Sequence, residues 1–308
     1  MDKKLYRIRN WKDYNRALEQ RGSITIWFDE KAREKWIAKP EGKKGRPVWY
    51  SETAILSTMA IRYIFHLPLR QTEGLMKDLA QMLGIAIDVP DYTTMCIRQR
   101  GLKIDLPRKR SRLYLVVDSS GLKIFGEGEW KVRIHGYSKR RTWRKLHIGV
   151  GPDRHIEIAK LTGPEASDSR MFEELLKEVP GKTKYAIADG AYDYKSCYRA
   201  AVEQKVRLIT PPRKGSKILR LEGMRAPPIA MRNKHVQIVH EQGLKAWKIK
   251  TKYHRRSLVE NAFFRLKTIF GERLASRLAE NQRAEALIKC MLLNKMSQVG
   301  MPKSVAVI

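Results

Sequence analysis

The sequence predicts an α/β fold preceded by a helical region, and two observations lead to this prediction. The first hundred residues place apolar side chains at helical spacing, whereas short apolar runs rich in β-branched residues begin near Arg112. These runs first follow one another and then alternate with amphipathic stretches. Clustered strands followed by β-α-β-α-β indicate a mixed sheet with an antiparallel edge.

The first helices are marked by their end signals. Ser51 is suited to N-cap a helix over Glu52–Phe65, and a second helix is expected over Leu69–Leu83, ending at Gly84. A short helix over Tyr92–Arg100 follows a turn. The order of helix, turn and short basic helix is that of a helix-turn-helix DNA reader.

The short helix carries Thr93, Thr94 and Arg98, whose side chains suit base edges and phosphates. They are the candidate DNA contacts of this region. An ordinary helical bundle with a solvated polar face accounts for the same pattern, and the sequence leaves both interpretations open.

The second part of the chain supplies the sheet. Strands are expected at Leu113–Val117, Leu122–Phe125, Lys145–Val150, His155–Leu161, Tyr185–Ala188 and Val206–Thr210, and helices at Ser167–Val179, Tyr192–Gln204, His254–Phe270 and Asn281–Val299. Residues 213–252 contain prolines, many basic residues and weak strand signals, which indicate a basic insertion. We therefore expect a helical DNA-binding region at 1–110, a catalytic domain at 111–300 and a C-terminal tail at 301–308.

Charge identifies the class of partner. The chain of 308 residues has 63 Lys and Arg against 32 Asp and Glu, a formal net charge of +31, and most of the excess lies after residue 108. Such a surplus calls for a polyanion, nucleic acid first. No apolar run is long enough for a membrane span, and the three separated cysteines form no CxxC pair. We expect a protein of the reducing cytoplasm.

Three acidic residues lie in apolar surroundings. Asp118 and Asp189 each follow a short apolar strand, and Glu260 lies in a helix beside Val259 and Phe263. Carboxylates in such places are costly unless they are paired or bind a metal. Their oxygens suit Mg²⁺ or Mn²⁺, and two such ions could promote phosphoryl transfer. We take these three acids as candidate catalytic residues and metal ligands.

The helix with Glu260 also places Tyr253, Arg256 and Lys267 on the same narrow stripe. Such a stripe can hold a metal-binding carboxylate between groups that bind phosphates, although solvated charged stripes are common. The spacing Tyr-(2)-Arg-(3)-Glu-(6)-Lys resembles the signature of DDE transposases from bacterial insertion sequences, most closely the insertion-sequence family five branch. The segments LYLVVDSSGLK, WRKLH and YAIADGAYD resemble further segments of that family.

The resemblance implies an RNase H-like mixed sheet with flanking helices, in which Asp118, Asp189 and Glu260 bind two Mg²⁺ ions, with Mn²⁺ able to substitute. It implies hydrolysis at the ends of a mobile element, then attack of the freed 3′-hydroxyl on target DNA. Tyr253, Arg256 and Lys267 are expected to contact phosphates. The implied partners are double-stranded DNA, as terminal inverted repeats and target, and a second copy of the chain on paired ends in the nucleoid.

Basic residues around two tryptophans are further candidate DNA contacts. Trp143 lies between Arg141 and Arg144, and Trp247 lies among lysines. Each tryptophan could stack on an unpaired base or pack into the core.

Two other functions remain open at this point. One is a transposase-derived DNA-binding protein without catalysis, and the other is an RNase H-like nuclease without strand transfer.

Overall fold

The computed structural model describes residues 5–27, 33–39, 47–107, 111–124, 143–179, 182–220 and 226–307. The chain divides into two compact units: Met1–Ile104 together with Met291–Ile308, and Asp105–Cys290. In the described part of the chain, no helix combines the length and apolar character needed to cross a membrane.

The first unit is mainly helical, as predicted. Its helices are α1 (Trp11–Arg21), α2 (Ile24–Trp27), α4 (Glu52–Ile64), α5 (Leu69–Met82) and α6 (Tyr92–Arg98). The Ser51 side chain accepts a hydrogen bond of 3.1 Å from the Ala54 amide, so the predicted N-cap of α4 is confirmed. Gly84 follows α5 with a φ of 61°, a conformation that favours glycine.

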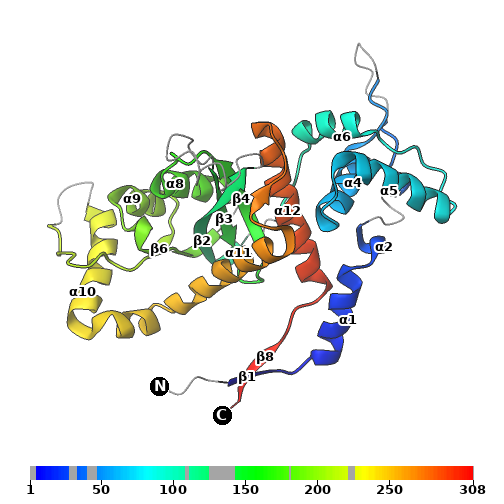
Figure 1. The fold of residues 1–308 in the computed structure, drawn as a ribbon. Coiled ribbons are helices and arrows are strands. Elements are labelled where there is room, and N and C mark those ends of the chain that lie inside the picture. The colour runs from blue at the N-terminus through cyan, green and yellow to red at the C-terminus, as the bar shows by residue number, and fades with distance from the viewer. Residues whose placement is uncertain are drawn as a thin grey trace, which may run out of the picture. The chain divides into compact units, whose positions relative to one another are not determined.

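The two ends of the chain meet in the first unit. Strand β1 (Leu5–Ile8) pairs antiparallel with β8 (Ser304–Val307), as Figure 1 shows. The segment expected to be a tail, 301–308, therefore contains a strand. Its partner lies at the opposite end of the sequence, so no local pattern could reveal the pairing.

The second unit contains a mixed sheet, which confirms the α/β class. Its strands are β2 (Ser111–Ile124), β3 (Trp143–Val150), β4 (Ile156–Thr162), β5 (Lys182–Ile187), β6 (Arg207–Ile209) and β7 (Arg273–Leu274). The order of the described strands is β4-β3-β2-β5-β6, with β7 paired to β2. Strands β2, β5 and β6 are parallel, and β2, β3 and β4 are antiparallel. The strands expected at Leu113–Val117 and from Leu122 onward belong to one continuous strand, which the structure describes as far as Ile124.

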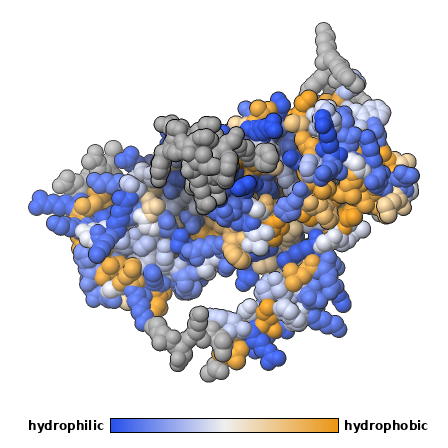
Figure 2. Space-filling view, viewed as in Figure 1, coloured by the Kyte–Doolittle hydropathy of each residue, from blue (hydrophilic) through white to orange (hydrophobic). Residues whose placement is uncertain are grey.

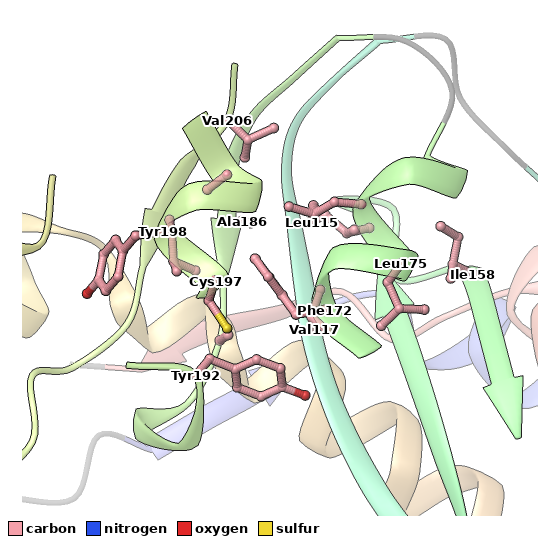
Figure 3. Close-up of a cluster of buried hydrophobic side chains, with 14 residues drawn as sticks. Leu115, Val117, Ile158, Phe172, Leu175, Ala186, Tyr192, Cys197, Tyr198 and Val206 are labelled. Atoms are coloured by element: carbon pink, nitrogen blue, oxygen red, sulfur yellow. The ribbon is translucent and has the colours of Figure 1, made fainter. Parts of the chain in front are cut away.

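Helices cover the two faces of the sheet. Helices α8 (Asp168–Glu178) and α9 (Lys195–Glu203) pack on one face, and α11 (Ser257–Phe270) packs against β2 and β3 (Figure 1). Figure 3 shows Leu115 and Val117 of β2 directed toward Phe172 and Leu175 of α8. These buried contacts hold β2 in the centre of the unit.

The basic insertion differs from the prediction. It forms the helix α10 (Ala226–Lys250), interrupted at Gly243, whereas the sequence suggested weak strands. The helix packs on α9. Strand propensity reflects only nearby residues, so it could not predict this tertiary contact. The chain continues through the 3₁₀ turn Tyr253–Arg256 and α11 to α12 (Ala279–Val299).

Candidate active site

Asp118 lies in the middle of β2, not at the end of a strand as expected. It is paired with Ile148 of β3, and its Oδ1 accepts a hydrogen bond of 2.9 Å from the Ser119 amide. Its side chain is only 15% exposed, and this burial raises the pKa of Asp118 above its ordinary value. A buried carboxylate of this kind requires a positively charged partner.

The sheet register brings Asp189 level with Asp118. Val116 of β2 is paired with Ile187 of the parallel strand β5, and each aspartate follows two residues later. The Asp189 side chain turns the chain after β5 by accepting a hydrogen bond of 2.9 Å from the Ala191 amide. Parallel pairing therefore places the two acids side by side.

Arg256 connects these two acids to Glu260. Its Nη2 lies 3.1 Å from Asp118 Oδ2 and 3.9 Å from Asp189 Oδ2, and its Nη1 lies 2.7 Å from Glu260 Oε1. The last pair joins residues one helical turn apart. The structure thus gathers the three predicted acids around a single guanidinium.

The chemistry of this donor set fits a hard divalent cation. Carboxylate oxygens are preferred by Mg²⁺ and Mn²⁺, and the three carboxylates already surround a positive charge. In the present arrangement, no three His, Cys, Asp or Glu side chains of the described residues are placed to hold one ion. The guanidinium of Arg256 lies between the acids instead.

A partly buried polar network supports β2 next to Asp118. Asp168, the first residue of α8, accepts hydrogen bonds from Ser119 Oγ at 2.9 Å and from Lys145 Nζ at 3.1 Å. His147 is fully buried, with Nδ1 3.6 Å from the same carboxylate oxygen and Nε2 2.9 Å from Thr162 Oγ1. The sequence alone does not predict this network, because Lys145 reaches Asp168 only through the pairing of β3 with β2.

Tyr253 and Trp247 belong to the packing of α10. Trp247 has no exposed surface, and its Nε1 donates a hydrogen bond of 3.0 Å to His235 Nδ1. The Trp247 ring also packs against Tyr253, with centroids 5.1 Å apart. Of the two roles left open for Trp247, packing into the core is the one seen in this structure, because the indole is fully covered. Burial raises the pKa of Tyr253 to about 12, so its hydroxyl stays protonated at neutral pH.

Three other predicted DNA contacts, Lys267, Arg144 and Trp143, have neighbours of their own within the second unit. Lys267 pairs with Glu272 over 3.9 Å, and Arg144 Nε donates a hydrogen bond of 2.9 Å to Gln282. Trp143 lies over Gly121 of β2, where an added Cβ would come within 3.0 Å of the indole ring. Arg141 lies outside the described residues.

The candidates of α6 have partners within the first unit. The side chains of Thr93 and Thr94 both donate to Asp91, the N-cap of α6, and Arg98 Nη1 donates a hydrogen bond of 2.8 Å to the Tyr50 carbonyl. The threonines thus complete the helix start, and the arginine ties α6 to the preceding segment.

A basic cavity that the sequence did not predict lies beside α10. Its volume is about 650 Å³, and it lies between α10 and the strands β5 and β6. Its lining includes Arg207, Lys234 and Lys250, together with apolar side chains such as Leu208 and Met231. Hydrophilic residues cover much of the region of α9 and α10 in the view of Figure 2. The cavity requires the fold of α10 onto the sheet, so spacing alone could not reveal it.

Two family models match the chain, and both are described as a transposase DDE domain. One matches residues 19–127 and the other residues 109–295. Among solved structures, the Drosophila P element transposase strand transfer complex is similar with 9% sequence identity, over 93% of this chain and 86% of that chain. Its TM-score of 0.30 is too low to carry an argument.

Proposed function

The chain belongs to the transposases with a DDE domain, and we propose that it cuts DNA at the ends of a mobile element and joins the freed ends to target DNA. The observation that carries this proposal is the meeting of Asp118, Asp189 and Glu260 around Arg256. An RNase H-like arrangement of β2, β3, β4 and β5 forms part of the proposal, as does membership of the insertion-sequence family five branch.

The three acids would hold the metal ions. DDE transposases generally use divalent metal ions, and we propose two Mg²⁺ ions, with Mn²⁺ able to substitute. When bound, such ions stabilise charge on the attacking and leaving oxygens of a phosphodiester. Asp118 of β2, Asp189 just after the adjacent strand β5 and Glu260 of α11 would supply the oxygens.

Arg256 and Tyr253 would act on the phosphate itself. A guanidinium binds phosphate oxygens in a fixed fork, and Arg256 lies within 4 Å of all three acids. Tyr253 precedes it in the same 3₁₀ turn and keeps its proton, so it could donate to a phosphate oxygen. Residues outside the acid cluster, among them Lys267, Trp143 and Arg144, would contact DNA farther along the duplex.

Binding of DNA by the whole chain is supported by its net charge of +31. We propose that the helices around α6 bind terminal inverted repeats, and that two copies of the chain hold paired ends. Holding both ends at once explains the need for a dimer.

The test is a gel assay of cleavage and strand transfer on duplexes that carry the element's own inverted repeats, with Mg²⁺ or Mn²⁺ at several salt concentrations. Glu260→Gln should bind these duplexes as the wild type does but neither cut nor join them. Glu280→Gln changes an exposed acid elsewhere and is the matched control. Robust cleavage by Glu260→Gln would refute the assignment, and cleavage by the wild type without joining would reduce the function to that of a nuclease.

A further inference from the structure

The Arg256 side chain is held by the acids that surround it. One terminal nitrogen is 3.1 Å from Asp118 and the other is 2.7 Å from Glu260, while Asp189 lies 3.9 Å away. The Arg256 side chain is 24% exposed and that of Asp118 is 15% exposed, so their contact is partly shielded from water, whereas Glu260 is 54% exposed. Ion pairs that are partly desolvated interact more strongly than pairs on an open surface.

The position of this guanidinium matters because it lies among the proposed metal ligands. A divalent ion bound to Asp118 and Glu260 would compete with Arg256 for these two carboxylates, because each of them now accepts a hydrogen bond from the guanidinium through one oxygen. The positive charge of the arginine would also repel an approaching cation. A metal ion and the present position of Arg256 are therefore alternatives.

We propose that Arg256 is an internal counter-ion, which occupies the metal site of the DNA-free protein and lowers the affinity of that site for divalent metal ions. This inference rests on the proposed function and adds a form of regulation to the same site. The negative phosphate at the cleavage point draws the guanidinium away from the acids, because arginine and phosphate form strong bidentate hydrogen bonds. The carboxylates are then free to bind metal.

The exchange makes metal binding and DNA binding favour each other. Two ligands that each bind better when the other is present share one coupling free energy, so the effect is reciprocal. Metal-dependent cutting would then start only where a phosphodiester occupies the site. In a DNA-free protein, Arg256 would remain hydrogen-bonded to Asp118 and Glu260 even in a solution of metal ions.

Mn²⁺ binding to the DNA-free full-length chain tests this directly, with free Mn²⁺ measured by electron paramagnetic resonance. Arg256→Gln should bind Mn²⁺ about 5- to 150-fold more tightly than the wild type, the usual range of such coupling. The double variant Arg256→Gln with Asp118→Asn should lose this increase in Mn²⁺ affinity. That loss would show that the additional Mn²⁺ binding takes place at the three acids. Arg255→Gln is the matched control, because the neighbouring Arg255 stacks 4.5 Å above the Tyr114 ring instead.

The melting temperature provides a second measurement, which also shows whether each variant is folded. Mn²⁺ should raise the melting temperature of Arg256→Gln more than that of the wild type, and Arg256→Lys should have an intermediate Mn²⁺ affinity. Equal Mn²⁺ affinity in the wild type, Arg256→Gln and Arg256→Lys would overturn the inference. The proposed function has its own readout, which is the cutting and joining of the element's own ends in the gel assay and not the affinity for Mn²⁺.

Duplex DNA completes the test. After subtraction of Mn²⁺ bound by the duplex alone, an inverted-repeat duplex should raise the Mn²⁺ affinity of the wild type and leave that of Arg256→Gln nearly unchanged. An equal rise in both proteins would show that the phosphate does not act through Arg256.

Discussion

Ser119 and Asp168 join β2 to the start of α8 through a hydrogen bond of 2.9 Å. The amide of the same serine donates to the Asp118 carboxylate, also over 2.9 Å. One residue therefore connects the buried network on one face of the sheet to the acid on the other.

We expect Asp168→Asn to lower the rate of DNA cleavage by about 10- to 100-fold, the usual effect of residues that orient metal ligands. The variant side chain lacks the negative charge that pairs with Lys145, and Ser119 Oγ then donates to a weaker, uncharged acceptor. The measurement is cleavage as a function of Mn²⁺ concentration, in which a positioning role raises the concentration needed for half-maximal rate. Glu173→Gln on the exposed side of α8 is the control, and an equal loss there would point to general destabilisation.

The buried His147 predicts a pH dependence of stability. Burial lowers its pKa to about 4 from an ordinary 6.5, so the folded protein disfavours the charged imidazole. The stability that it contributes is fully present above pH 6.5 and is lost as pH falls toward 4, by at most about 3 kcal/mol.

His147→Gln should flatten that part of the curve. Urea unfolding between pH 4 and pH 7.5 measures the difference between the two proteins. A wild-type free energy of unfolding that falls no more steeply with acid than that of the variant would contradict the prediction.

Trp247→Ala should destabilise the protein by about 3–5 kcal/mol, because it removes a fully buried indole and leaves a cavity. Trp247→Phe should cost less, since it retains the ring that packs on Tyr253 but loses the hydrogen bond to His235. Chemical denaturation measures both. Unchanged stability with weakened DNA binding would restore the base-stacking interpretation.

The basic cavity beside α10 should contribute to DNA affinity. Replacing Lys234 and Lys250 by Gln should weaken the salt dependence of DNA binding. The slope of the logarithm of the DNA-binding constant against the logarithm of salt concentration should become shallower by about 0.9 for each lost phosphate contact. Lys245→Gln with Lys248→Gln removes the same charge from exposed positions of the same helix and should change the slope less. Equal slopes in the two double variants would show that the cavity has no special role.

Much of the local structure follows from the sequence. Ser51 and Gly84 are end signals whose effect depends only on neighbouring backbone groups, and helices α4 and α5 lie where those residues place them. The alternation of strands and helices after residue 111 predicted the α/β class, because hydrophobic periodicity is also a property of residues close together in the chain. Strand length was less predictable: Asp118 interrupts an apolar run, but pairing with β3 carries β2 through it.

By itself, the sequence predicted a polyanion as partner, the fold class and the three acids as candidate catalytic residues. Only the tertiary structure decided that parallel pairing of β2 and β5 sets Asp118 level with Asp189, that Arg256 lies among the acids, and that Trp247 is buried. The physical reason is the separation along the chain over which each interaction acts. End signals and hydrophobic periodicity act over a few residues, whereas the pairing of charges 138 residues apart depends on how sheet and helices pack.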